Sequence, residues 1–164
     1  MKPTPSLKAR ALQWLAQREQ SRVELRRKLL PHAASAAEAA GDDASTARAT
    51  VEALLDWLEE HKYLSAERFV ESRVHARAAR FGNLRIRGEL KQHALALPAE
   101  AAQALAHSEL DRATQLVDRK FGAVPATPAA RARQARFLAG RGFSPDTIRS
   151  VLRRTGTAAA GDAD

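Results

Sequence analysis

Apolar residues recur along the chain at the spacing of short amphipathic helices. In the segment 65–81, four of them fall within one sector of a helical wheel: Val70, Val74, Ala78 and Phe81. Three in the next segment also share a face: Ile86, Leu90 and Leu97. Alanine, the best helix former, occurs 36 times, whereas isoleucine occurs twice and valine seven times. These features exclude a β-barrel or β-sandwich and predict an all-α fold of eight or nine short helices.

Capping residues mark the expected helix ends. Ser21 and Glu24 have the spacing of a capping box, and Ser108 with Asp111 has that of its acidic analogue. Three further residues are expected to open helices: Ser65, Asn83 and Ser144, the last of which precedes a proline. Two glycines that follow basic helical runs are expected to end helices in the left-handed conformation: Gly82 and Gly122.

The predicted helices recur in threes. Leu97 and Phe143 begin similar segments at an offset of 46 residues. A period in this range is typical of stacked helical arrays, in which one unit cannot bury its apolar face alone. We predict an elongated array of three tandem three-helix repeats, at 5–60, 65–107 and 108–154. Two segments without large apolar residues depart from this scheme, and we expect a mobile insertion with frayed helix at most at 31–47 and a disordered tail at 155–164.

Charge narrows the choice of partner. The 164-residue chain has 27 Lys and Arg against 19 Asp and Glu, a formal net charge of +8. Such an excess favours an anionic partner, either nucleic acid or an acidic protein surface. The alternative is that an arginine- and alanine-rich composition only reflects a GC-rich genome. Basic and acidic blocks alternate along the chain, which predicts a fold with a basic face and an acidic one.

Basic residues flank the apolar faces of two neighbouring helices, where long side chains can lie along the surface and present their charged ends to a partner. The predicted central contact residues are Arg73, Arg77, Arg80, Arg85, Arg87 and Lys91. The predicted outer contributors are Arg22, Arg26, Arg27, Arg131, Arg133 and Arg136. The alternative interpretation is an ordinary solvated flank, partly neutralised by Glu67 and Glu71.

No motif of an enzyme emerges, so we expect no catalytic residues, no metal and no cofactor. No glycine-rich run precedes a Lys-Ser or Lys-Thr pair, which excludes a P-loop. The five histidines never fall three or four residues apart, and the chain contains no cysteine. No stretch approaches the roughly 18 apolar residues of a membrane span. We therefore expect a soluble cytoplasmic protein without a membrane contact.

Four ring-bearing residues could have served as ligands or base-stacking groups. His93 shares a sector with Ile86, so we interpret it as a partly buried helix histidine. Trp14 and Trp57 lie near apolar neighbours on helical wheels and are interpreted as core anchors. Tyr63, which precedes Leu64, is interpreted as a core residue too.

Three motifs, in order along about residues 7–154, together carry a family resemblance. The first runs from Arg18 to Leu29 and includes Ser21, Glu24, Leu25 and Lys28. The second comprises Tyr63-Leu64, Arg68-Phe69-Val70, Arg73, Arg77, Gly82, Arg85-Ile86 and Glu89-Leu90. The third runs from Arg136 through Arg141, Gly142, Phe143 and Ser144, followed by Asp146, Ile148, Val151 and Leu152. In these residues the chain resembles the RecX family of recombinase regulators.

The resemblance implies a chain of three-helix repeats that binds RecA and lodges in the groove of its filament on DNA. It implies inhibition of strand exchange, of ATP hydrolysis and of repressor self-cleavage, in DNA repair and the SOS response, without catalysis by this chain. We expect a monomer. The chain departs from the family pattern at Ser65-Ala66 and Gly82-Asn83, which are exchanges between capping residues, and in the long segment after Leu30.

Two other functions stay open at this stage. The first is a stand-alone helical DNA-binding protein that acts without RecA, for which binding to naked DNA would depend steeply on salt. The second is a structural helical scaffold whose charge has no binding role. Whether protein or DNA makes the main contact is open as well.

Overall fold

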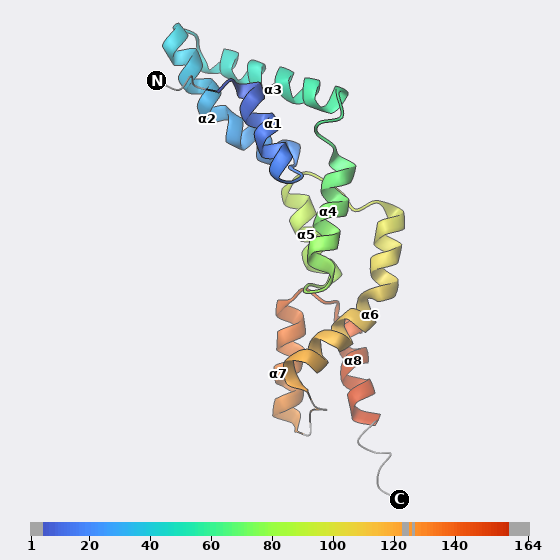
Figure 1. Cartoon of the computed structure of the whole chain (residues 1–164). Coiled ribbons are helices and arrows are strands. Elements are labelled where there is room, and N and C mark those ends of the chain that lie inside the picture. The colour runs from blue at the N-terminus through green and yellow to red at the C-terminus, as the bar shows by residue number, and fades with distance from the viewer. Residues whose placement is uncertain (1–4, 123–124, 126, 158–164) are drawn as a thin grey trace, which may run out of the picture. The chain divides into compact units, whose positions relative to one another are not determined.

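The computed structural model describes residues 5–122, 125 and 127–157, and the side chains up to Arg153 within them. This part of the chain forms eight α-helices and no strand, which confirms the all-α prediction (Figure 1). The helices are α1 (Leu7–Gln17), α2 (Arg22–Ala40), α3 (Ala44–Glu60), α4 (Ala66–Ala78), α5 (Asn83–Gln92), α6 (Ala99–Phe121), α7 (Pro128–Gly140) and α8 (Pro145–Thr157). The chain divides into two compact units. Unit 1 contains the residues up to Ser72 together with His93–Leu95, and unit 2 contains Arg73–Gln92 together with the residues from Ala96 onward.

Unit 1 is built on α2, which packs along α3 and against α1 (Figure 1). Its fully buried large side chains include Leu25, Leu29, Val51, Leu55 and Leu58. The predicted capping box at the start of α2 is confirmed. The Glu24 amide donates to Ser21 Oγ at 3.0 Å, and the Ser21 amide donates to Glu24 Oε2 at 3.3 Å.

The segment 31–47 is helical over most of its length, whereas the sequence predicted frayed helix at most. Helix α2 continues through Pro31 to Ala40, Gly41 ends it at φ 79°, and α3 begins at Ala44. Three alanines of this helical hairpin are buried: Ala33, Ala37 and Ala47. Small side chains let two helices approach closely, so this packing needs no large apolar residue.

The tryptophan prediction is confirmed, because Trp14 and Trp57 are partly buried against the core of unit 1. Tyr63 is not a core residue, since its exposed fraction is 49% while the neighbouring Leu64 is buried. The Tyr63 ring lies instead against Trp57, with 5.6 Å between ring centroids. His93 is partly buried as predicted, although it lies just beyond the end of α5.

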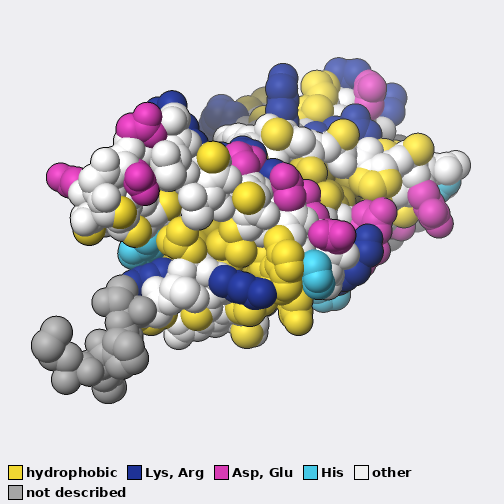
Figure 2. All heavy atoms as spheres, turned by 90° about the horizontal axis from the view of Figure 1, so that it is seen from above, with side chains coloured by type: hydrophobic (Ala, Val, Ile, Leu, Met, Phe, Trp, Pro, Cys, Tyr) yellow, Lys and Arg dark blue, Asp and Glu magenta, His cyan; other side chains and the backbone are white. Residues whose placement is uncertain are grey.

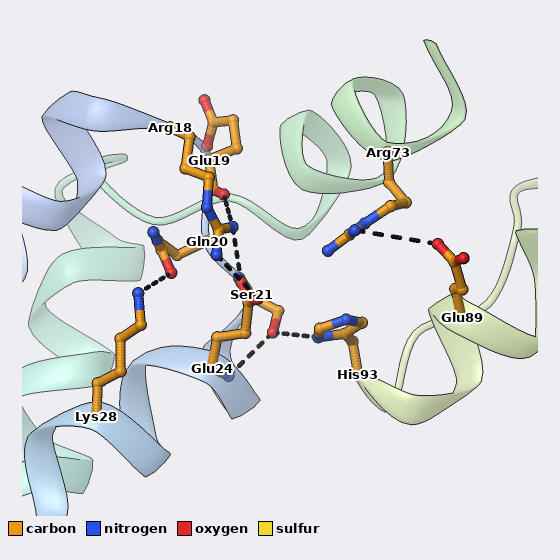
Figure 3. A network of polar contacts seen from close by, with 9 residues as sticks. All are labelled: Arg18, Glu19, Gln20, Ser21, Glu24, Lys28, Arg73, Glu89 and His93. Carbon is orange, nitrogen blue, oxygen red and sulfur yellow. Dashed lines mark hydrogen bonds and ion pairs between the residues drawn. The ribbon is translucent and has the colours of Figure 1, made fainter. Parts of the chain in front are cut away.

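His93 belongs to a polar network of unit 1. Its Nδ1 atom lies 2.8 Å from Ser21 Oγ (Figure 3). Ser21 is the capping residue of α2, and Arg18 forms two hydrogen bonds of 3.1 Å with Glu24 in the same place. Burial works against the charge of Glu24, but the hydrogen bonds from Arg18 and from the Ser21 amide lower its pKa below the ordinary value.

The core of unit 2 lies among α6, α7 and α8. Its buried members are Ala113, Leu116, Val117, Leu138, Phe143 and Val151. Ser144 caps α8 as predicted, because its Oγ accepts from the Thr147 amide at 3.2 Å. The predicted left-handed glycine after α6 is also confirmed, with Gly122 at φ 66°. The expected tail at 155–164 lies mostly outside the described residues, and α8 reaches Thr157.

Ser108 does not begin a helix, which corrects the second capping prediction. It lies in the middle of α6, which bends there (Figure 1). Ser108 Oγ donates to the Ala104 carbonyl at 3.0 Å and contacts the Leu105 carbonyl at 3.3 Å. Arg112 Nη2 donates to the same Leu105 carbonyl at 3.1 Å. Side chains that bind carbonyls of the preceding turn often bend a helix, which accounts for the bend.

Gly82 has a different role from the predicted left-handed stop, because its φ is not positive. It lies where the α4–α5 turn meets the α7–α8 turn. The Gly82 amide donates to the Arg141 carbonyl at 2.9 Å, and the Leu84 amide donates to the Gly142 carbonyl at 3.1 Å. A Cβ atom on Gly82 would lie 2.3 Å from the Gly142 oxygen, so only glycine allows this approach.

Glu109, in the middle of α6, is 5% exposed and joins the starts of two helices. Its Oε1 accepts from the Asn83 amide at 2.8 Å. Its Oε2 accepts from Ser144 Oγ at 2.9 Å and from Thr147 Oγ1 at 2.8 Å. Asn83 is thus the first residue of α5, held by a carboxylate from α6, and not the capping residue that we expected.

Arg112, one turn after Glu109, uses all five of its N–H donors. The acceptors are the carbonyls of Ala78, Phe81 and Leu105, Asn83 Oδ1 and Ser108 Oγ, at 2.6–3.2 Å. Burial lowers the pKa of Arg112, and attraction to Glu109 opposes that shift. The two residues fix the C-terminal end of α4 and the start of α5 onto α6 within unit 2.

Candidate functional site

Three of the predicted central arginines converge on one carboxylate in unit 2. Arg77 Nε lies 2.9 Å, Arg85 Nε 3.5 Å and Arg73 Nη1 4.0 Å from a Glu89 carboxylate oxygen. Figure 3 shows the Arg73 guanidinium pointing toward Glu89. Glu89 is thus an acidic partner that all three arginines share.

The turn between α4 and α5 gathers arginines around a phenylalanine. The guanidinium carbons of Arg85, Arg77, Arg141 and Arg80 lie 4.5, 5.3, 5.5 and 5.9 Å from the centroid of the Phe81 ring. We call these five residues the Phe81 cluster. A cation near an aromatic ring is attracted by its quadrupole, which holds the guanidinium groups in place without neutralising them. The cluster can therefore present N–H donors to an anion.

Arg141 links the Phe81 cluster to a second pair of aromatic rings. Its guanidinium carbon also lies 5.1 Å from the centroid of Phe137, on α7. Phe137 meets Phe121 edge to face, with 5.4 Å between centroids. Lys120 Nζ lies 5.9 Å from the centroid of the Phe137 ring, and the guanidinium carbon of Arg133 lies 5.9 Å from the centroid of the Phe121 ring. Basic groups beside aromatic rings thus continue from α4 and α5 to α6 and α7 within unit 2.

The remaining predicted residues of unit 2 lie outside these two aromatic groups. Arg87 and Lys91 are exposed on α5, four residues apart and therefore on one side of the helix. Arg131 and Arg136 are exposed on α7. The structure brings Arg77, Arg80 and Arg85 together around Phe81 and places Arg133 beside Phe121.

The predicted residues of unit 1 have a different setting. Arg22 forms ion pairs with Glu52, Asp56 and Glu59 of α3, and Arg26 pairs with Glu52. Burial works against the charge of Arg22, but hydrogen bonds to Glu52 and Asp56 raise its pKa above the ordinary value. Hydrogen bonds from Arg26 and Arg22 lower the pKa of Glu52 to about 2. An external anion would have to compete with these carboxylates.

Arg27 differs from Arg22 and Arg26, because its side chain is exposed on α2. Figure 2 shows acidic and basic side chains interspersed on the face seen from above. Positive charge on this face is therefore mixed with negative charge.

Sequence reasoning did not single out Arg141 as a contact residue. It follows the end of α7, so a search for basic stripes along helices passes over it. Its position between Gly140 and Gly142 indicates a turn but does not indicate that the side chain contacts Phe81. The roles of Glu109 and Arg112 were missed as well, because two opposite charges three residues apart on a helix resemble an ordinary surface pair.

The described residues form neither a metal site nor a membrane-spanning helix. No three His, Asp or Glu side chains lie together as they would to hold a metal ion. None of the helices within the described ranges is long and apolar enough to cross a membrane.

Comparisons with known proteins agree with the motifs. A family profile described as the third three-helix domain of RecX matches residues 107–152. The chain is 49% identical over 153 residues to a "Regulatory protein RecX" of Herbaspirillum seropedicae, with 92% of each chain covered. It is 48% identical to proteins of the same name from Ralstonia nicotianae, covering 90% of this chain and 86% of that one, and from Leptothrix cholodnii, covering 93% and 90%. The chain therefore belongs to the RecX family of regulatory proteins.

Proposed function

We propose that this chain binds RecA and its filament on DNA, and that it inhibits the recombinase, ATPase and coprotease activities of RecA in DNA repair and the SOS response. The family supports a regulatory role. The observation that carries the molecular proposal is the Phe81 cluster, in which four guanidinium groups surround one ring. The chain acts as a cytoplasmic monomer by occupying a surface, and it catalyses no reaction.

A nucleoprotein filament offers two kinds of anion, DNA phosphates and acidic side chains of the protein. Guanidinium groups bind both through paired N–H donors. Each exposed ion pair contributes less than about 1 kcal/mol by itself. Several such contacts on one rigid surface add up to a useful affinity, since the later contacts form at a high effective concentration.

The contact surface that we propose is centred on unit 2. Its central members are Arg73, Arg77, Arg80, Arg85, Arg87 and Lys91, with Arg141 added from the geometry. Arg131, Arg133 and Arg136 are proposed outer contacts on α7. Arg22, Arg26 and Arg27 are weaker candidates in unit 1, because the first two already pair with carboxylates of α3.

The test replaces two exposed members of the Phe81 cluster, Arg80→Glu and Arg85→Glu together. We expect inhibition of DNA-dependent ATP hydrolysis by RecA to fall by about tenfold or more, because attraction to an anion becomes repulsion. The matched control is Arg48→Glu with Lys62→Glu, which makes the same charge change at exposed residues of unit 1. Equal inhibition by both double variants would disprove the central role of the cluster. Circular dichroism verifies that the variants remain helical.

The alternative is direct DNA binding without RecA. Co-sedimentation with RecA, single-stranded DNA and a slowly hydrolysed ATP analogue separates the two functions. Dependence of sedimentation on all three components supports the filament as the target. Equal binding to naked DNA, with affinity that falls steeply as salt rises, supports the alternative.

A further inference from the structure

A second basic surface lies between α7 and α8, away from the Phe81 cluster. Two adjoining open hollows of about 390 and 500 Å³ share Arg131 and Leu152 as lining residues. We call the two hollows together the α7–α8 groove. None of its lining residues belongs to the Phe81 cluster.

The two helices present one side each to this groove. On α7 the lining residues include Arg131, Ala132 and Ala135, which are spaced by one, three and four positions and share a helix face. On α8 they are Arg149, Leu152 and Arg153, with the same spacing. A short turn joins the helices, so the two faces run antiparallel beside each other.

The groove has an apolar floor and a basic rim. Ala132, Ala135 and Leu152 supply the floor, and the short alanine side chains leave the space that larger residues would fill. The rim carries three exposed arginines: Arg131, Arg149 and Arg153. Arg149 is paired with the exposed Asp146 on its own helix, so the positive charge that the proposal uses is that of Arg131.

We propose that the α7–α8 groove binds a peptide segment of a partner protein that carries acidic side chains beside an apolar one. Carboxylates would meet the arginine rim, and the apolar side chain would cover Ala132 and Leu152. A DNA backbone would use the arginines but would gain nothing from the apolar floor, since its phosphates and sugars are hydrated. The groove therefore favours a peptide. The proposal shares Arg131 with the outer contacts of the proposed function, but it does not depend on the Phe81 cluster.

The test measures the fluorescence anisotropy of a short labelled peptide in which aspartate and glutamate alternate with leucine. Arg131→Glu should weaken binding by about tenfold. Ala132→Leu should weaken it comparably although no charge changes, because the new side chain fills the groove. Ala132 is exposed, so the folded state tolerates the larger residue. The matched controls are Arg119→Glu on α6 and Ala139→Leu on α7, which change exposed residues that do not line the groove and should leave peptide binding unchanged.

Several results would overturn the proposal. Unchanged peptide binding by Ala132→Leu would remove the groove as the site. Equally tight binding of a peptide with serine in place of leucine would show that the apolar floor has no role. A thymidine oligonucleotide that binds the wild type and loses affinity in Ala132→Leu would assign the groove to nucleic acid. If Arg80→Glu with Arg85→Glu abolishes filament inhibition but leaves peptide binding intact, the two surfaces act independently, as we propose.

Discussion

The arginines of α2 and those around Phe81 meet different numbers of carboxylates. On α2, Arg22 and Arg26 face three carboxylates of α3, and these ion pairs hold two helices of unit 1 together. Around Phe81, four arginines share an aromatic ring, with Glu89 as the nearby carboxylate. The number of basic residues therefore does not measure the charge available to a partner. The acids on the facing helix decide it.

The Phe81 cluster depends on the close approach of the α4–α5 turn to the α7–α8 turn. Gly82→Ala would place a Cβ atom 2.3 Å from the Gly142 carbonyl oxygen. We expect the free energy of unfolding to fall by about 3 kcal/mol or more, measured by denaturant titration with circular dichroism. The matched control is Gly88→Ala inside α5, where a Cβ atom meets nothing within 4 Å. That variant should gain up to about 1 kcal/mol, because alanine favours a helix. Equal stability of both variants would contradict the close approach.

Arginines that stabilise the fold contribute different free energies in the two units. Arg112→Met removes five hydrogen bonds inside unit 2, and we expect a loss of about 3 kcal/mol in the free energy of unfolding. Arg22→Met removes ion pairs with carboxylates that are more than 40% exposed, so we expect a loss of only about 1 kcal/mol. Chemical denaturation of both variants measures the difference. A larger loss of unfolding free energy in Arg22→Met than in Arg112→Met would contradict this expectation.

The ion pairs of unit 1 predict a pH dependence. The pKa of Glu52 falls from 4.5 to about 2 on folding, so its stabilising contribution is complete above pH 4.5 and is lost as the pH falls toward 2. Glu52→Gln should therefore cost about 1 kcal/mol at pH 7 and almost nothing near pH 2. The same substitution in an Arg22→Met, Arg26→Met background should show no such pH dependence. If the stability difference between the wild type and Glu52→Gln stays constant from pH 7 to pH 2, the pKa of Glu52 is not lowered by these ion pairs.

The smallest effect concerns the ring itself. Phe81→Leu keeps an apolar residue in the turn but removes the aromatic ring that holds the guanidinium groups. We expect the affinity for RecA filaments on single-stranded DNA to fall by about two- to fivefold, since a cation–π contact contributes about 0.5–1 kcal/mol. Tyr63→Leu is the control, because it removes an exposed ring from unit 1. If the two variants bind equally, Phe81 does not organise the cluster.

The all-α fold and several helix ends were accessible from the sequence, because they depend on local chemistry. The capping box of Ser21 and Glu24, the cap at Ser144 and the left-handed Gly122 each satisfy backbone groups next to them in the chain. The hairpin at 31–47 was missed because its packing depends on small side chains, which a search for large apolar residues overlooks. The division into repeats at 5–60, 65–107 and 108–154 remains a prediction.

The other misses involve residues far apart in the sequence. Gly82 owes its role to a turn about 60 residues later, and Glu109 binds the starts of α5 and α8 at once. Nothing near Ser108 in the sequence shows that its hydroxyl binds carbonyls inside a continuous helix. The arginines around Phe81 were predicted in part, but Arg141 reaches the ring only through the contact of two turns. Local patterns cannot reveal such contacts.

The unbroken course of α6 limits how this protein can be taken apart. A cut between Leu105 and Arg112 would split one helix. It would also separate Arg112 from the Leu105 carbonyl that it binds. Segments that share a helix in this way cannot be exchanged as independent units. A shortened descendant of this chain would keep α6 whole or lose the structure on both sides of it.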